Sequence, residues 1–254
     1  MTRPDHKFIW HELNTTDIDA AAAFYGALLG WTIRDEERET YLHFYQGGDA
    51  VAGLVEAEGG QPPHWQMYVG TSDMEAYAER AEGTGAKALS PLLDIPGTGK
   101  LQVFADPEGG VLAAMQPADA DRGSWNLESG PGRFCWVELM CDDVNAEVGF
   151  YKQVAGWDTL PMDVGGVDYH ILTPPGGEQQ DGVGGVMQKM QPGPTAWLGY
   201  IAVEDVDAML VRAKDLGAQP MGDAIDVGEF GRCGLITDPT GAVVALYQSK
   251  QAGC

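Results

Sequence analysis

The stretch from Trp10 to Trp31 constrains this chain more than any other feature, because it occurs twice. Its sequence, WHELNTTDIDAAAAFYGALLGW, returns without a gap from Trp136 to Trp157 as WVELMCDDVNAEVGFYKQVAGW, and nine of the 22 positions are identical. An ungapped match of this length indicates that one structural unit has been duplicated. We therefore interpret the 254 residues as two related halves.

Each copy predicts a strand followed by a helix. Residues 8–15 alternate, so that Trp10 and Glu12 point to one face and His11 and Leu13 to the other. Thr16 or Asp17 can cap the helix that follows, and Gly30 ends it. The helical spacing predicts a buried face in each copy, made of Ile18, Ala22, Tyr25 and Leu29, and of Val144, Val148, Tyr151 and Ala155.

Three short strands are expected after the first helix, at 32–37, 40–45 and 50–57, which completes a βαβββ module. The same order recurs with a strand at 65–70, a helix at 73–82 and strands at 87–92, 101–106 and 111–116. The second half repeats this pattern: residues 94–116 match 226–248 at an offset six residues larger, and both segments contain the turn Asp-Pro-x-Gly. The change of offset places an insertion in the loop 174–181.

Two domains account for the chain. Residues 117–133 are rich in Asp, Gly, Ser and Pro and read as a linker between a domain at 1–116 and a domain at 134–254. Each domain is predicted to be a pair of βαβββ modules. The expected fold class is therefore α+β, with two tandem domains.

The charge of the chain excludes several partners. Asp and Glu outnumber Lys and Arg by 38 to 15, a formal charge of -23, which repels phosphate backbones and anionic lipids. We expect no nucleic-acid partner. No apolar run approaches the roughly 18 residues of a membrane span, so we expect a cytoplasmic protein without a membrane partner. The four cysteines lack CxxC spacing and are predicted to be reduced thiols, two or three of them buried.

An opening strand, then D-(x)6-F-Y-(x)4-G-W, then D-P-x-G before a last strand, resembles the vicinal oxygen chelate superfamily of glyoxalases, bleomycin resistance proteins and dioxygenases. The resemblance covers nearly all of residues 8–248, and it is strongest to tandem two-domain glyoxalase-like proteins of bacteria. It implies that paired βαβββ modules curl a sheet into an open cleft. Most characterised members coordinate a divalent metal in that cleft, and others bind a bulky ligand without one.

The resemblance also locates the usual metal ligands, and this chain lacks most of them. Family members place ligands on the first strand seven residues before the helix-capping Asp, on the fifth strand, and on the eighth strand four residues after the Gly of D-P-x-G. Tryptophan, leucine and alanine cannot ligate a divalent ion, so we predict no metal site of the usual kind and no cofactor. The residues at these positions are Trp10, Gln66 and Ala113 in the first half and Trp136, Leu198 and Ala245 in the second.

A relocated metal site remains the alternative. Glu12 lies two residues beyond Trp10 on the same strand face, and other possible ligands occur in the same half. Their spacing fits no short metal motif. The full set is Glu12, His43, Glu56, His64 and Gln66.

What recurs in both halves is an aromatic wall with one carboxylate. A glutamate beside indole rings is desolvated, which raises its pKa and suits a general acid or base, so Glu12 and Glu138 are the candidate catalytic residues. In the alternative interpretation, the two tryptophans fill the cleft and the glutamates accept hydrogen bonds from the backbone or from tyrosine. The candidate ligand-binding residues are Trp10, Glu12, Gln66, Tyr68, Trp136, Glu138 and Tyr200, with Trp65 and Trp197 nearby.

These observations leave three candidate functions. The first is a glyoxalase/bleomycin-resistance-like protein that binds a small aromatic or apolar molecule without a metal, as a monomer or homodimer. The second is a metal-dependent lyase, isomerase or dioxygenase of glyoxalase type with displaced ligands. The third is a protein-interaction role for the acidic body, for which the sequence offers no exposed amphipathic segment. The absent ligand set favours the first.

Overall fold

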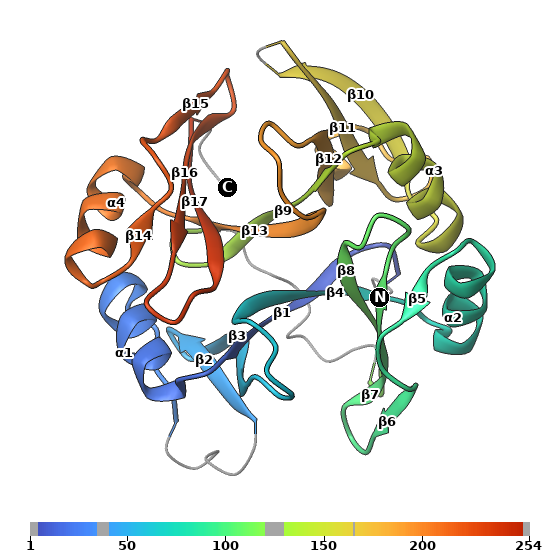
Figure 1. Ribbon diagram of the computed structural model, residues 1–254, viewed down its shortest axis with the longest axis horizontal. Coiled ribbons are helices and arrows are strands. Elements are labelled where there is room, and N and C mark those ends of the chain that lie inside the picture. Colours follow the sequence, from blue (N-terminus) through green and yellow to red (C-terminus); the bar gives the residue numbers. More distant parts are fainter. Residues whose placement is uncertain (1–4, 35–40, 120–129, 165, 251–254) are drawn as a thin grey trace. The chain divides into compact units, whose positions relative to one another are not determined.

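The computed structural model describes residues 5–34, 41–119, 130–164 and 166–250 (Figure 1). No helix in this part of the chain is long and apolar enough to cross a membrane. Its elements follow the order strand, helix, strands four times over. They are β1 (Phe8–Thr15), α1 (Ile18–Leu29), β2 (Leu42–Gln46), β3 (Asp49–Glu56), β4 (His64–Gly70), α2 (Met74–Gly83), β5 (Lys87–Ala88), β6 (Leu93–Ile95), β7 (Gly99–Ala105), β8 (Val111–Pro117), β9 (Phe134–Cys141), α3 (Val144–Val154), β10 (Asp158–Val164), β11 (Val167–Thr173), the 3-10 turn η3 (Gln179–Asp181), β12 (Gly184–Gln188), β13 (Ala196–Ala202), α4 (Val206–Asp215), β14 (Gln219–Pro220), β15 (Ile225–Val227), β16 (Gly231–Thr237) and β17 (Val243–Ser249).

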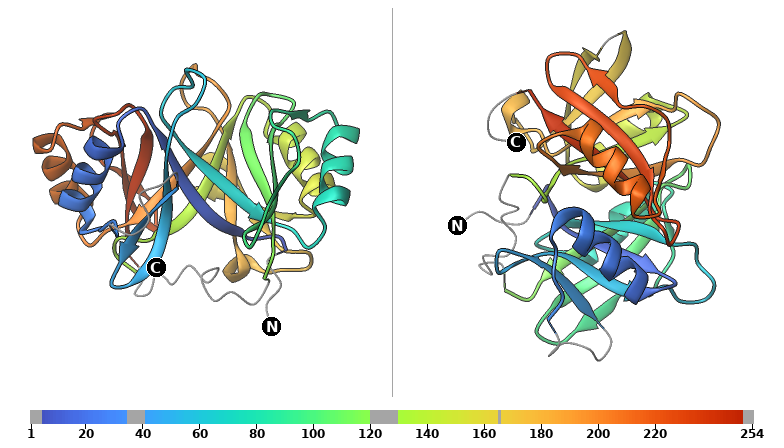
Figure 2. Two further views of the ribbon diagram at one scale, coloured as in Figure 1. Left: turned by 90° about the horizontal axis from the view of Figure 1, so that it is seen from below. Right: turned by 90° about the vertical axis from the view of Figure 1, so that its left-hand side faces the viewer.

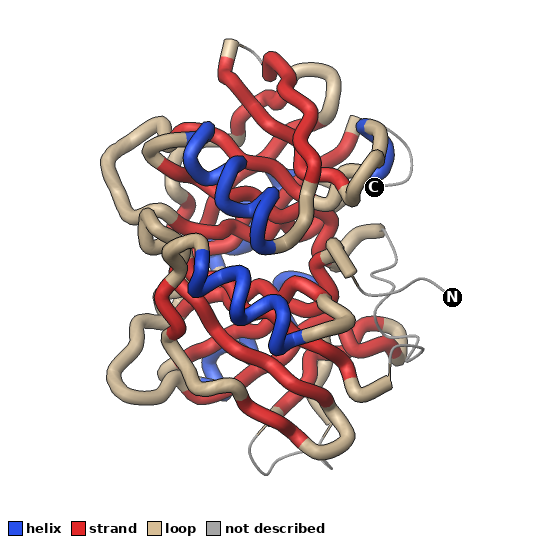
Figure 3. The backbone as a smooth tube through the Cα atoms, turned by 90° about the vertical axis from the view of Figure 1, so that its right-hand side faces the viewer, coloured by secondary structure: helices blue, strands red, loops and turns tan. Residues whose placement is uncertain are grey.

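The strands form two open, mixed sheets, one from each half of the chain, which confirms the α+β class. The first sheet has the order β2-β3-β1-β4-β8-β7-β5, with β6 on β7, and the second has the order β10-β11-β12-β9-β13-β17-β16-β14, with β15 on β16. Within each module the first strand runs parallel to its partner and the remaining pairs run antiparallel. Figure 3 shows that the backbone contains more strand than helix and that the helices lie against the strands.

Each of the four helices begins in the same way. An aspartate precedes the helix in extended conformation, and its carboxylate accepts the backbone N–H three residues on at 2.9–3.0 Å, which satisfies one of the free donors of the first turn. Asp17 caps α1, and Gly30 ends it in the left-handed region at φ 76°. Both predictions for this helix are confirmed.

The buried face of α1 differs from the one predicted. Ala21, Phe24, Tyr25 and Leu28 are buried, whereas Ile18, Ala22 and Leu29 are not. Four consecutive alanines carry little information about the face of the helix, and the Phe24-Tyr25 pair decides it by the larger apolar area that it buries. In α3, Val144 and Tyr151 are buried as predicted, while Val148 is half-buried.

Two predicted strands are also different. Of residues 32–37, Thr32 makes an isolated bridge to Tyr45, and positions 35–37 lie outside the described residues. The strand expected at 87–92 is interrupted, and β5 and β6 flank a segment that contains Pro91. Proline supplies no backbone N–H to a strand ladder, which accounts for the interruption.

The chain divides into two compact units, and each combines modules from both halves. One contains α1 and α4 and comprises Trp10–Gln66, Asn126–Cys135 and Leu198–Cys254; the other contains α2 and α3 and comprises Met1–Ile9, Met67–Trp125 and Trp136–Trp197. We call them the α1/α4 unit and the α2/α3 unit. Inside them, α1 packs beside α4 and α2 beside α3 (Figures 1 and 2). The boundaries at 116 and 134 stay a prediction.

The two sequence motifs meet in the core of each unit. In the α1/α4 unit, the Tyr25 hydroxyl donates to Asp238 Oδ2 at 2.9 Å and accepts from Trp65 Nε1 at 3.0 Å. The other carboxylate oxygen of Asp238 accepts the backbone N–H groups of residues 240, 241 and 242 and so holds the Asp-Pro-x-Gly turn. The same bonds recur in the α2/α3 unit at 2.9 and 3.0 Å between Tyr151, Asp106 and Trp197.

This arrangement settles the role of several predicted residues. Tyr25 and Tyr151 are core residues, as expected. Trp65 and Trp197, which the sequence placed near the aromatic wall, point instead to these tyrosines on the helix side of their strands. The prediction of buried thiols is confirmed for Cys141 and Cys233.

Candidate functional site

A tryptophan, a tyrosine and a glutamate form one network in the α1/α4 unit. Trp10 and Glu12 project from the same face of β1, and Trp10 Nε1 donates to the Tyr41 hydroxyl at 2.8 Å. That hydroxyl is in turn hydrogen-bonded to the Glu12 carboxylate. Gly53 of β3 lies opposite Glu12, and a Cβ there would overlap the Tyr41 hydroxyl. The glycine therefore makes room for the tyrosine. We call Trp10, Tyr41 and Glu12 the first-half site.

The α2/α3 unit repeats the tryptophan–tyrosine bond over a glycine that lies opposite a glutamate. Trp136 Nε1 donates to the Tyr169 hydroxyl at 2.7 Å, and Gly185 of β12 lies opposite Glu138 of β9. A Cβ at Gly185 would overlap the Tyr169 hydroxyl. We call Trp136, Tyr169 and Glu138 the second-half site.

The electrostatics of the first-half site fix its donors and acceptors. Burial, followed by the negative charge of Glu12, raises the pKa of Tyr41, so its hydroxyl stays protonated and donates. Glu12 is 8% exposed and Glu138 7% exposed, and Glu12 Oε1 also accepts from Asn14 Nδ2 at 3.2 Å. Each indole N–H donates to a tyrosine hydroxyl.

The sequence comparison missed Tyr41 and Tyr169, because the spacing between the halves changes in this region. The difference in residue number between equivalent positions is 126 at Glu12/Glu138 and 132 at Gly53/Gly185. Between them, His43 lies opposite Gly53 and Ile171 lies opposite Gly185, so these two residues are equivalent, and their numbers differ by 128. The insertion is thus not confined to the loop 174–181: two of the six residues precede β11. An alignment with two gaps would have matched the tyrosines.

The remaining predicted ligand-binding residues are buried. Gln66, Tyr68 and Tyr200 are 4%, 6% and 9% exposed, and Gln66 and Tyr68 share one face of β4. Tyr68 belongs to the α2/α3 unit, and Gln66 and Tyr200 belong to the α1/α4 unit. Across the neighbouring strands, Tyr68 lies in register with Ala113 and Val103, and Tyr200 lies in register with Ala245 and Leu235. Each tyrosine therefore has apolar residues beside it in the sheet.

The residues at the usual metal positions do not fit a divalent ion. In the described part of the chain no group of three or more His, Cys, Asp and Glu side chains could hold a metal. Of the alternative set, Glu56 is exposed and His64 Nδ1 lies 2.9 Å from the Pro62 carbonyl oxygen. His43 packs edge-on to Trp10 at 5.8 Å between ring centroids. Three potential ligands therefore do not converge there.

His11, predicted on the face of β1 opposite Trp10 and Glu12, is buried, at 1% exposed. Its ring stacks on Phe134 at 3.9 Å, and neither ring nitrogen has a hydrogen-bond partner among the described residues. Burial lowers the pKa of His11 to about 3, so the ring is neutral. The cations Lys100 and Arg232 form surface ion pairs with Glu75 and with Asp207.

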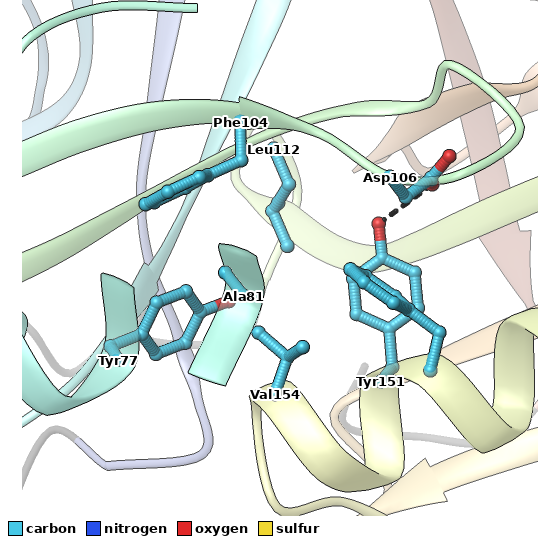
Figure 4. A pocket seen from close by; sticks show the side chains of 8 residues that line it. Tyr77, Ala81, Phe104, Asp106, Leu112, Tyr151 and Val154 are labelled. Atoms are coloured by element: carbon cyan, nitrogen blue, oxygen red, sulfur yellow. Dashed lines mark hydrogen bonds between the residues drawn. The ribbon is translucent and has the colours of Figure 1, made fainter. Parts of the chain in front are cut away.

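A second polar cluster lies inside the α2/α3 unit. Glu147 of α3 is 1% exposed and hydrogen-bonds to Asp106, the carboxylate that accepts from Tyr151. Burial, followed by the Asp106 charge, raises the pKa of Glu147 to about 8. Asp106 also lines a cavity of about 10 Å³, room for roughly one water molecule. Figure 4 shows the side chains around it. Its aromatic and aliphatic lining marks it as a packing defect rather than a ligand site.

Comparisons with known proteins agree with this fold. The model of the glyoxalase-like domain matches residues 10–114 and 136–247. CFP32 of Mycobacterium tuberculosis, named as a glyoxylase, is 31% identical over 94% of this chain and 93% of its own length. The anthracycline biosynthesis protein DnrV of Streptomyces peucetius is 30% identical over 95% of this chain and 93% of its own.

Among solved structures, the Mn(II)-bound glyoxalase from Novosphingobium aromaticivorans superposes with a TM-score of 0.65 at 18% identity, covering 99% of this chain and 84% of that one. At that identity the likeness shows a shared fold. Together with the duplicated βαβββ modules and the family match over both halves, it shows that the chain belongs to the glyoxalase-like family of the vicinal oxygen chelate superfamily.

Proposed function

We propose that this protein binds a flat, largely apolar small molecule at its two Trp–Tyr–Glu sites, without the metal that most relatives use. The observation that carries the proposal is the recurrence of one network over a glycine in both halves. In each half a tryptophan N–H donates to a tyrosine hydroxyl that lies over a glycine, and that glycine is in register with a glutamate, Glu12 or Glu138. A rigid indole face beside an oriented carboxylate suits an aromatic ring that has a hydrogen-bond donor on its edge.

The absence of the usual ligand set supports binding over metal chemistry. Tryptophan and alanine occupy positions where the family has metal ligands. The residues in register with Tyr68 and Tyr200 on the next strand are also alanines. A metal ion would find little oxygen or nitrogen there, whereas an apolar ring would gain buried area. One relative of this chain is named for anthracycline biosynthesis, and anthracyclines are flat polycyclic aromatics.

Isothermal titration calorimetry of the purified protein with anthraquinone tests the proposal. We expect saturable binding, weakened by about tenfold in Trp10→Ala and in Trp136→Ala, because each loses an aromatic contact surface of one site. Trp31→Phe, in the helix-packed core, provides a control for tryptophan content; it lies in no Trp–Tyr–Glu site. Unaltered affinity in both alanine variants, with folding verified by circular dichroism, contradicts the proposal.

A glyoxalase-type lyase or isomerase is the second candidate, since CFP32 is named as a glyoxylase and Glu12 and Glu138 are buried carboxylates that could move a proton. Metal analysis of the purified protein, followed by thermal shifts with Mn, Ni, Zn and Fe, separates the candidates. One metal ion per domain, lost in Glu12→Gln and Glu138→Gln, would favour the enzyme over the metal-free binding protein.

A further inference from the structure

The two Trp–Tyr–Glu sites differ at one position on the same sheet face. In the α1/α4 unit the registers set Glu12, Gly53 and His43 side by side across β1, β3 and β2. In the α2/α3 unit the corresponding row is Glu138, Gly185 and Ile171. Residues in register on adjacent strands face the same side. The first-half site therefore has an imidazole where the second-half site has a buried alkyl group.

His43 is packed into the first-half site. Its ring lies 5.0 Å from that of Tyr41 and 5.8 Å from that of Trp10, centroid to centroid, in edge-on arrangements. On its other side Tyr45 lies at 6.0 Å, and the Arg34 guanidinium sits 3.7 Å above the Tyr45 ring. The imidazole is thus placed beside the Tyr41–Glu12 pair by three aromatic contacts.

A second difference points the same way. Asn14, two residues beyond Glu12 on the strand, donates its amide to the Glu12 carboxylate at 3.2 Å. The corresponding residue after Glu138 is Met140, whose side chain has no N–H or O–H group. The first-half site is the more polar of the two at two positions on separate strands.

From these differences we infer that the two sites are specialised: the first-half site selects an aromatic ligand with a hydroxyl group on its edge more strongly than the second-half site does. This inference rests on the proposed function and names the ligand class of the first-half site. A phenolic or enolic hydroxyl can donate and accept at once, which matches a site that has a carboxylate, a tyrosine hydroxyl and an imidazole within one row. Ile171 offers no such partner, and a hydroxyl desolvated against it would lose its hydrogen bonds to water.

Reciprocal exchange of the two residues tests the inference. The probes are anthraquinone and its 2,6-dihydroxy derivative, titrated by calorimetry into the full-length protein. His43→Ile should weaken the dihydroxy probe by about tenfold and anthraquinone by less than twofold, the loss that corresponds to one hydrogen bond. Ile171→His should strengthen the dihydroxy probe at the second-half site. His64→Ile, at the start of β4, is the matched control.

The outcomes separate the two levels of the proposal. If neither probe binds the unmodified protein, both the proposed function and this inference fail. If both probes bind and His43→Ile weakens them equally, or leaves both unchanged, the sites are binding sites but His43 does not select the hydroxyl. Circular dichroism melts of each variant verify folding, and the reverse variant, Ile171→His, decides the question if His43→Ile does not fold.

Discussion

The pair Glu147–Asp106 makes the α2/α3 unit less stable as the pH rises into the alkaline range. Glu147 is 1% exposed and hydrogen-bonded to Asp106, which is itself 6% exposed, and one oxygen of Glu147 has no partner among the described residues. Burial, and then the charge of Asp106, raises the pKa of Glu147 from 4.5 to about 8, and burial also raises the pKa of Asp106. The two carboxyl groups therefore share a proton at neutral pH.

The sign and size of the effect follow from the difference between folded and unfolded protein. Since the folded state holds the Glu147 proton more tightly, its contribution is fully present below pH 4.5 and is lost as the pH rises to about 8. A shift of that size corresponds to about 5 kcal/mol at most. Glu147→Gln removes the charge and keeps the shape. We expect the variant to match wild type at pH 5 and to exceed its Tm by on the order of 10 °C at pH 9.

Circular dichroism melts at pH 5, 6, 7, 8 and 9 measure this difference. Glu79→Gln, on the exposed face of α2 in the same unit, is the control and should track wild type across the series. A Tm difference between Glu147→Gln and wild type that is constant from pH 5 to pH 9 would refute the shared proton. A lower Tm for Glu147→Gln at every pH would show instead that the carboxyl pair stabilises the unit.

Three further predictions concern other parts of the molecule. Tyr25→Phe should lower the free energy of unfolding by about 1–3 kcal/mol in urea titrations, because it removes the bond to Asp238 and leaves a buried indole N–H unpaired; an unchanged midpoint would contradict this role. Gly53→Ala should displace the Tyr41 hydroxyl and destabilise the protein by about 1–3 kcal/mol, with weaker anthraquinone binding by calorimetry. Burial and neighbouring carboxylates raise the pKa of Cys141 to about 12, so it should resist a thiol reagent at pH 8 until the protein is unfolded, as peptide mass analysis would show.

The sequence was sufficient for the fold because its signals were both local and repeated. β1 begins and ends where the alternation predicts, and Asp17 and Gly30 bound the first helix. The Asp-Pro-x-Gly motif was recognised as a turn, but its bond to Tyr25 was not predictable. Asp238 and Tyr25 are 213 positions apart, and no periodicity within one half relates the first helix to the last turn.

The site was predictable to a lesser degree for the same reason. Trp10 and Glu12 were identified because they stand in an ungapped repeat, whereas Tyr41 was missed because a two-residue insertion lies between that repeat and Tyr169. Glu147 was overlooked because it occupies a position filled by Ala21 in the first half. A buried carboxyl group has no sequence signature when its partner, Asp106, comes from a different module.

The duplication supplies an internal control for what each residue does. The bond from tyrosine to the turn aspartate recurs in both units, as does the bond from tryptophan to a tyrosine that lies over a glycine, so these features are compatible with either half of the fold. His43 and Ile171 occupy one backbone position in the two halves, and the fold accepts both. A residue that the same fold replaces by isoleucine is not required for its geometry. We therefore expect the imidazole of His43 to act in recognition, and the exchange of these two residues is the experiment that separates recognition from architecture.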